Sequence, residues 1–579
     1  MKTTLFMICL SLSLNYQLLG QNHREIEGVL LSKETNEPVQ FANIYNLSLQ
    51  KGTLSNTDGY FRIIVDDVLD TILITCIGFK EKQLKLIQYE SRYEVILEEN
   101  SYLLNEVTII PKDNSYLFDL IHKCRKTASS RDSKSKAYYE LKSYKDEEQI
   151  ELVEGYYNTD ISGYALNNLD LKAGRIALRS AKNRFFTSLE GSRAIMMLNL
   201  LSGSDRFPKN PLELSRSSMK KNFYLRLDNK YLEGNADSVY VIEYQPKDKN
   251  GAFFEGKMWI NKTKSQILKI TLNCTNAKTH PFLALFQSDK VSNVNFTITQ
   301  SFKELNGHAV FNQIDFIYTI DYNSRIGKEE EESYSIKTKA ILYAYDFDDT
   351  FFLPIFDFNQ YTPGDYCKIN AMPYNDFFWR FNDEYSLNDS IDSNELFFSD
   401  STSLTNKSLF KKNTVSKKGL FEHPYLSWSE NRIKFRENFS DTLVQQNTAG
   451  YNSEKYNLAV KIFLDKNSYA DSTDILTATI IDPYESYYRL PMDKQSDCFI
   501  NMYFDLHEMA RMELLEELKT NRNNNAQEQY EGFMRKFSGK INEFLKAVDR
   551  GTSKKEMIQY NQYIYERLGI DNIDIFKPF

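Results

Sequence analysis

The stretch GTLSNTDGYFRI, residues 52–63, stands between two short alternating apolar runs. Its Asp-Gly pair and two aromatic residues suggest a metal site, part of an enzyme or a chain reversal. Asp favours turns and Gly tolerates positive φ, so Asp58-Gly59 predicts a β-hairpin turn. Tyr60 and Phe61 then begin a strand with side chains on opposite faces. A single carboxylate argues against Ca²⁺, which takes six to eight oxygen ligands.

Short β-type runs continue on both sides of this turn, from Glu25 to Ile110. Turn clusters such as NEP and NTDG separate them at spacings of about 8–12 residues. This pattern predicts a small antiparallel β-sandwich over residues 25–110.

Five landmarks follow one another in this region: Gly28-Val29, EPVQFANIYN, GTLSNTDGYFRI, ITCIGFK and LNEVTII. In this order they resemble the carboxypeptidase regulatory-like domain, a transthyretin-like β-sandwich common at the front of envelope proteins in Bacteroidetes-type bacteria. The resemblance implies an accessory module without catalytic residues of its own. The residues expected to shape this sandwich are Gly28, Pro38, Asp58, Gly59, Tyr60, Phe61, Gly78 and Phe79.

The six histidines argue against a zinc carboxypeptidase. Such an enzyme places two zinc ligands in a His-x-x-Glu pair, and no histidine here is followed by Glu at that spacing. His507-Glu508 also fails the His-Glu-x-x-His pattern, because Arg511 occupies the last position. We therefore predict no catalytic residue, metal or cofactor from these motifs.

The first residues predict export. Residues 1–20 combine Lys2, an apolar core and a small residue at the end, which is the order of a secretory signal peptide. No later apolar run reaches the roughly 20 residues of a membrane-spanning helix. We expect a protein of the periplasm, outer-membrane surface or cell surface of a Gram-negative bacterium, and the net charge of −8 argues against nucleic-acid binding.

After the sandwich, residues 115–131 read as an amphipathic linker helix, and RDSKSK, residues 131–136, as a polar hinge. Residues 137–384 form a β-rich body. Its hairpin GKMWINKTKSQILKI, residues 256–270, resembles strands of the lipoprotein-carrier-like half-barrel, an open sheet curled around a helix. Residues 176–203 are then expected to supply helical filler.

The rest of the chain divides into an irregular linker and a helical end. Residues 385–450 are rich in Ser, Asn, Asp and Lys, which is typical of a linker. Residues 455–579 begin with the strand-like YNLAVKIFL and continue as a mostly helical unit. Its expected helices span residues 497–519, 526–548 and 554–568. The predicted fold class is mainly β with α, a multidomain α+β chain.

One short motif imitates a phosphatase. Asp346 to Thr350 (DFDDT) match the Asp-x-Asp-x-Thr loop of haloacid-dehalogenase-type phosphatases. That loop follows a buried parallel strand and precedes a helix, but the strand here alternates and Pro354 soon follows. We therefore expect a turn with solvated carboxylates at the end of an edge strand.

These observations favour a non-catalytic envelope protein whose sandwich is an interaction or spacing module. The β-rich body would bind a hydrophobic ligand or an envelope partner, with Trp259 and Phe282 as candidate contacts, although ordinary core packing is the more common role of such aromatics. An alternative is an envelope enzyme with a site in residues 346–384, around Asp365, Tyr366 and Trp379. Another is an accessory subunit of an outer-membrane transporter or secretion system. The ligand, the partner, the cysteine pairing and the oligomeric state do not follow from the sequence.

Overall fold

The computed structural model describes much of the chain in detail. The described residues are 24–49, 51–56, 58–65, 70–87, 91–100, 114–128, 131–178, 191–233, 237–284, 289–326, 330–355, 365, 368–369, 372–382, 426–435, 456–469, 472–481, 486–488, 493–521 and 525–579. The predicted signal peptide, the strand at LNEVTII and most of the linker at 385–450 lie outside them.

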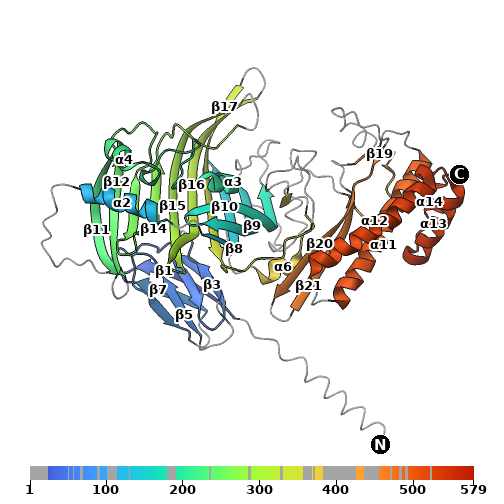
Figure 1. The fold of residues 1–579 in the computed structure, drawn as a ribbon, viewed down its shortest axis with the longest axis horizontal. Helices are drawn as coiled ribbons and strands as arrows, with labels where there is room; N and C mark the ends of the chain where they lie inside the picture. The colour runs from blue at the N-terminus through green and yellow to red at the C-terminus, as the bar shows by residue number, and fades with distance from the viewer. Residues whose placement is uncertain are drawn as a thin grey trace, which may run out of the picture.

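Seven short strands form the N-terminal sandwich (Figure 1). One sheet has the order β4-β1-β7 and the other the order β3-β2-β5-β6. The pairs are antiparallel except β1–β7, which is parallel. The strands are β1 (Arg24–Ser32), β2 (Asn43–Asn46), β3 (Lys51–Leu54), β4 (Tyr60–Val65), β5 (Thr71–Thr75), β6 (Lys82–Lys85) and β7 (Arg92–Leu97).

The turn at Asp58-Gly59 does not make a hairpin, so that prediction was wrong. β3 and β4 belong to different sheets, and the turn carries the chain from one to the other. The side-chain oxygen of Asn56 accepts hydrogen bonds from the backbone N–H of Asp58 at 2.9 Å and of Tyr60 at 2.8 Å, which closes the turn. Phe61 is fully buried in the core between the sheets.

Two glycines are needed for close approach in this sandwich. Gly59 has φ of 73°, and a Cβ there would lie 2.5 Å from the backbone oxygen of Leu30. Gly28 lies opposite Phe61, and a Cβ there would meet the Phe61 ring at 2.5 Å. Glycine at these positions therefore lets the strands and the ring pack.

The middle of the chain is a single antiparallel sheet of ten strands, in the order β10-β9-β8-β17-β16-β15-β14-β13-β12-β11. Two meanders meet where β17 pairs with β8. The strands are β8 (Asp132–Lys145), β9 (Glu148–Ser162), β10 (Ala165–Leu178), β11 (Phe223–Glu233), β12 (Asp237–Pro246), β13 (Gly256–Asn261), β14 (Gln266–Cys274), β15 (Lys290–Leu305), β16 (His308–Ile326) and β17 (Glu330–Tyr345).

This topology corrects two predictions. The polar segment RDSKSK is not a hinge, because β8 begins at Asp132 within it. The strand before Asp346 is not an edge strand, since β17 pairs with both β8 and β16. Alternation along a strand reports which of its two faces is buried, and does not tell whether a neighbouring strand pairs on each side.

The sheet curls over helix α2 (Ser115–Thr127), as Figure 1 shows. Leu117, Ile121 and Cys124 of α2 are buried in the large core. The tip of the β9–β10 hairpin also folds onto this concave face: the Tyr164 hydroxyl accepts from the backbone N–H of Ile267 at 3.0 Å. The short helices α3 (Gly191–Met197), η1 (Pro211–Glu213) and α4 (Arg216–Asn222) add further buried residues.

The C-terminal unit combines a small sheet with long helices. The sheet has the order β18-β21-β20, formed by β18 (Leu426–Ser427), β20 (Val460–Tyr469) and β21 (Ser472–Ile481), and β19 (Tyr456–Asn457) pairs with β22 (Tyr487–Tyr488). The helices are α11 (Lys494–Thr520), α12 (Ala526–Val548), η2 (Asp549–Gly551), α13 (Lys554–Leu568) and α14 (Asn572–Phe576). The expected helices are thus present, but the β20–β21 hairpin was not anticipated beyond its first strand.

Candidate binding site at the junction of the sheet and the C-terminal unit

The candidate site lies on the outer face of β8, β9 and β10, the face turned away from α2. Helix α6 (Asp376–Phe381) covers this face, and its Phe378 and Trp379 are buried against Tyr156 of β9. The ring centroid of Tyr156 lies 5.2 Å from that of Phe378 and 5.5 Å from that of Trp379. These are edge contacts, the arrangement that aromatic rings prefer.

A buried ionic network lies beneath Trp379. The Arg175 side chain pairs with the buried carboxylate of Glu154, and its guanidinium carbon lies 4.2 Å from the centroid of the Trp379 ring. The Tyr138 hydroxyl contacts the carboxylates of Glu154 at 3.1 Å and of Glu140 at 3.2 Å. Burial raises the pKa of Tyr138 well above its usual value, so it stays a hydrogen-bond donor. This network fixes α6 on the sheet.

A second buried ion pair joins the sheet to the C-terminal unit. Lys172 of β10 pairs with Asp465 of β20, and both side chains are almost fully buried. Lys172 also donates to the backbone oxygen of Phe352 at 2.7 Å. Asn375 caps α6 by accepting from Phe378 N–H at 3.0 Å and donates to Asp465 at 3.0 Å. Desolvation lowers the pKa of Lys172, although Asp465 opposes this.

A hollow of about 530 Å³ opens beside this ion pair. The large sheet, the segment after β17, α6, β20 and the start of α12 all contribute to its wall. Its lining is both aromatic and charged, and includes Lys136, Phe351, Phe352, Phe378, Lys466 and Tyr469. Its volume lies within the range of small-ligand sites, and its wall is about equally polar and apolar.

The rim of the hollow contains the phosphatase-like motif. Asp346 and Asp348 have positive φ, 46° and 68°, in the turn that follows β17. Lys136 pairs with Asp346 at 3.2 Å and with Asp349, and its ammonium lies 5.1 Å from the centroid of the Phe351 ring. The carboxylates therefore neutralise a lysine at an exposed turn, and the preceding strand is antiparallel, unlike the parallel strand that precedes the phosphatase loop.

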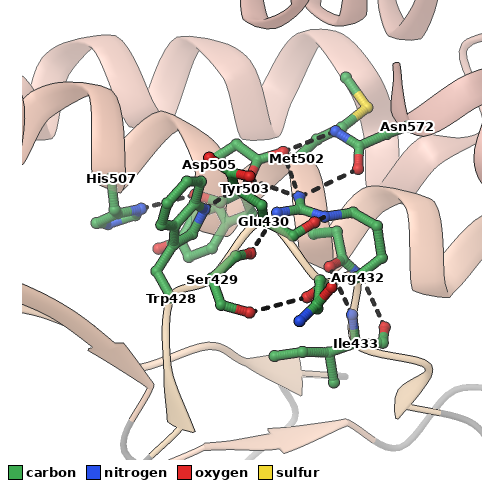
Figure 2. Close-up of polar contacts among 12 residues, drawn as sticks. Trp428, Ser429, Glu430, Arg432, Ile433, Met502, Tyr503, Asp505, His507 and Asn572 are labelled. Atoms are coloured by element: carbon green, nitrogen blue, oxygen red, sulfur yellow. Dashed lines mark hydrogen bonds and ion pairs between the residues drawn. The ribbon is translucent and has the colours of Figure 1, made fainter. Parts of the chain in front are cut away.

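A third ionic cluster holds the C-terminal unit together (Figure 2). The fully buried carboxylate of Asp505 on α11 accepts from Arg432 at 2.7 and 2.9 Å, from the Trp428 ring at 2.8 Å and from Asn572 at 2.7 Å. Trp428 and Arg432 lie in the segment that follows β18, and Asn572 lies in α14. Because every partner is buried or half-buried protein, we interpret the cluster as structural.

The structure separates the residues that the sequence proposed as sites. Trp379 lies on the outer face of the sheet, but Asp365 contacts Ser192 of α3 and lies near Tyr157, whose side chain belongs to the concave core. Tyr366 lies outside the described residues. Phe282 is also in the concave core, with its ring centroid 4.2 Å from that of Tyr318, whereas Trp259 packs on the outer face with Val241.

The sandwich residues proposed from the sequence lie at turns and close packing contacts. Leu31 forms an isolated bridge with Pro38, and Phe79 forms one with Glu99. Gly78 has φ of 94° with open space around it. The sequence reasoning missed Lys172, Asp465, Arg432 and Asp505, since a single charged residue in a strand or helix carries no signal that it is buried.

Two features that bear on chemistry and membrane insertion are absent from the residues that the structure describes. No group of three or more His, Cys, Asp or Glu side chains among them is placed to hold a metal ion. None of the helices in this part of the chain is long and apolar enough to cross a membrane.

Residues 26–109 match the family model of the CarboxypepD_reg-like domain. This part of the chain is therefore a carboxypeptidase regulatory-like domain, as its sequence landmarks predicted. No curated protein matches the chain.

Solved structures give weaker likenesses. A LolA superfamily protein from Nitrosomonas europaea is 10% identical, covering 40% of this chain and 91% of that one, with a TM-score of 0.16. A putative outer membrane lipoprotein-sorting protein domain from Vibrio parahaemolyticus is 14% identical, covering 40% and 92%, with a TM-score of 0.18. The MucA/MucB complex structure from Pseudomonas aeruginosa is 9% identical, covering 39% of this chain and 93% of that one, with a TM-score of 0.15.

Proposed function

We propose that the chain is an exported cell-envelope protein that acts by binding rather than by catalysis. The N-terminal sandwich would serve as an interaction or spacing module, and the β-rich body would hold the ligand or partner. This proposal takes up the family match of residues 26–109 and the signal-like residues 1–20.

The hollow of about 530 Å³ at the junction is the observation that supports the proposal best. Phe351 and Phe352 offer apolar surface there, while Asn467, Ser468 and Asn525 offer neutral polar groups. Such a wall suits an amphipathic molecule with an apolar part and a polar head. We place the ligand here rather than on the concave face, because Phe282, Tyr164 and α2 already pack that face.

The ionisable groups near the hollow also favour binding over catalysis. Lys172 and Arg175 are each buried against a carboxylate, so they are committed to joining segments. Lys136 is held by Asp346 and Asp349. A general acid or base needs a group that is free to exchange a proton with a substrate, and these side chains are arranged instead as paired charges.

Native mass spectrometry of the purified full chain tests this proposal. We expect the wild type, expressed with export in a Gram-negative host, to carry a bound molecule that organic solvent extracts. Thr350 is exposed and lines the hollow, so Thr350→Trp should fill it and abolish the adduct. Thr275→Trp, exposed at the end of β14, is the matched control and should retain it.

Two results would contradict the proposal. A folded wild type without any adduct would leave no support for a ligand. An adduct that persists in Thr350→Trp would show that the ligand binds elsewhere in the chain. Envelope fractionation with a high-salt wash distinguishes binding of a small ligand from binding to a membrane-held protein partner. Such a partner should keep the chain in the membrane fraction after the wash.

A further inference from the structure

A carboxylate is buried on the outer face of β16. Asp315 is 6% exposed and lies opposite Thr299 of β15 and Ile341 of β17. Its Oδ1 atom has no hydrogen-bond partner within the part of the chain that the structure describes. An unpaired buried carboxylate is costly in its charged form, so its surroundings need an explanation.

The N-terminal sandwich covers this part of the sheet (Figure 1). Tyr343, Gln313, Ser301 and Lys269 are successive cross-strand partners on β17, β16, β15 and β14. The sandwich reaches both ends of this row. At one end, Asn43 of β2 accepts a hydrogen bond from the Tyr343 hydroxyl at 3.3 Å. At the other end, Cys76 lies near Lys269. Burial raises the pKa of the Cys76 thiol, and the charge of Lys269 opposes this rise.

Asp315 therefore lies under the docked sandwich. It follows Gln313 by two residues on the same face of β16, and Gln313 is itself buried. Its neighbour Ile341 belongs to the same apolar cluster as Leu54 and Phe41 of the sandwich. Docking thus removes Asp315 from water.

The cations near Asp315 offset only part of the cost of burying its charged carboxylate. Lys269 and Lys339 are the described cations whose charges act on it, and each ammonium also lies over an aromatic ring, at 5.2 Å from Trp259 and 5.8 Å from Tyr144. Glu140 lies two strands away in the same cross-strand row, and Lys142 pairs with it at 3.2 Å. The described titratable groups near this interface also include the phenols of Tyr343 and Tyr45, the carboxylate of Asp346 and the thiol of Cys76. Burial raises the pKa of Asp315 to about 7, and the two lysines oppose this rise.

We propose that the sandwich docks on the large sheet in a pH-dependent manner, with Asp315 as the titrating group. The docked form carries a proton on Asp315, and the ionised carboxylate favours release of the sandwich. This inference does not rest on the proposed ligand site.

The direction of the effect follows from the two protonation states. When undocked, Asp315 is exposed and should have an ordinary pKa near 3.9. Below about pH 4 both forms are protonated, and docking is strongest. Between about pH 4 and pH 7 docking requires proton uptake, so the docking constant should fall up to about tenfold per pH unit. Above about pH 7 both forms are ionised, and the constant should level off.

Alkylation of Cys76 in the full chain measures this docking. Cys76 is half-buried at the interface, so undocking should expose its thiol. N-ethylmaleimide labelling of the Cys76 peptide is quantified by mass spectrometry between pH 5 and pH 8. The wild-type rate is divided by that of Asp315→Asn at each pH, which removes the intrinsic pH dependence of the thiol. We expect this ratio to rise with pH up to about tenfold per unit and then level off near pH 7.

Matched variants make the result specific. Asp321→Asn, on the same strand, where the carboxylate accepts a hydrogen bond from Asn293, should keep the wild-type pH dependence. Tyr343→Phe removes the contact with Asn43 and should raise labelling at every pH without changing its slope. Asp315→Leu is also neutral and should behave as Asp315→Asn. If only one of these two variants folds, it can serve alone as the reference for the labelling ratio. A ratio that stays constant from pH 5 to pH 8 would overturn the proposal.

Discussion

Lys172 of β10 and Asp465 of β20 lie 293 positions apart in the chain, and their buried charges pair where the large sheet meets the C-terminal unit. Asn375 of the α6 cap and Asn467 of β20 both donate to the same carboxylate. One carboxylate thus connects three segments that are distant in sequence. The geometry of the neighbouring hollow depends on it.

We expect Lys172→Met to destabilise the chain by about 3–5 kcal/mol, because it leaves Asp465 buried without its cation. The loss should appear as a lower urea midpoint for the C-terminal unit. In the double variant Lys172→Met/Asp465→Leu, at least half of this loss should be recovered, since no unpaired charge remains. Lys85→Met, on the exposed surface of β6, is the control. A change below about 1 kcal/mol in Lys172→Met would show that water reaches the pair.

Asp505 provides a second test of a buried charge (Figure 2). Its replacement by Ala removes an acceptor for Arg432, Trp428 and Asn572 together. We expect a loss of about 3–5 kcal/mol in unfolding free energy, and faster hydrogen exchange in α14 and in residues 428–432, which Asp505 connects. Asp574→Ala on exposed α14 surface should change stability by less than about 0.5 kcal/mol. Equal stabilities of the two variants would contradict the role given to Asp505.

The sequence predicted the local elements more reliably than their partners. The helix at 526–548 has an apolar face at helical spacing, and its observed bounds agree with the prediction. The sandwich also followed from turn spacing. By contrast, nothing in the alternating residues of β17 says that β8, almost two hundred residues earlier, pairs with it. Pairing of this kind is determined by long-range packing.

The candidate site was less predictable for the same reason. Trp379 was proposed from its aromatic surroundings, and the structure does place it in a buried contact, with Arg175. Asp365 was proposed beside it, but the two lie on opposite faces of the large sheet. A segment that crosses a sheet edge leaves no signal in sequence spacing. Buried lysines and aspartates in strands likewise look the same as exposed ones.

His507 should make the C-terminal unit sensitive to acid. Burial lowers its pKa to about 4, although a hydrogen bond to the Tyr503 backbone oxygen at 2.8 Å opposes this. The unfolded chain, with an ordinary histidine pKa near 6.5, takes up a proton that the folded chain does not. This stabilising contribution is therefore complete above about pH 6.5 and is lost as the pH falls toward 4, by about 3 kcal/mol in all.

Denaturation at pH 7 and at pH 4.5 measures this contribution. The difference between the two pH values should be smaller in His507→Gln than in the wild type by about 2 kcal/mol, because Gln stays neutral. His308→Gln, at an exposed turn of β16, should leave the wild-type difference unchanged. If His507→Gln kept the full pH difference, the acid sensitivity would have to come from carboxylates instead.

The turn in GTLSNTDGYFRI gives the sharpest test of the sandwich, because its two sheets are joined through Gly59. Gly59→Ala adds a Cβ at positive φ and 2.5 Å from the backbone oxygen of Leu30, so both strain and a clash follow. Gly78→Ala meets open space and suffers strain alone, worth about 1–3 kcal/mol. Thermal unfolding of the full chain should therefore show a larger loss for Gly59→Ala in the transition that includes β1 and β4. Equal losses for the two variants would mean that the turn relaxes away from Leu30, and that the close approach of β1 is not what requires glycine there.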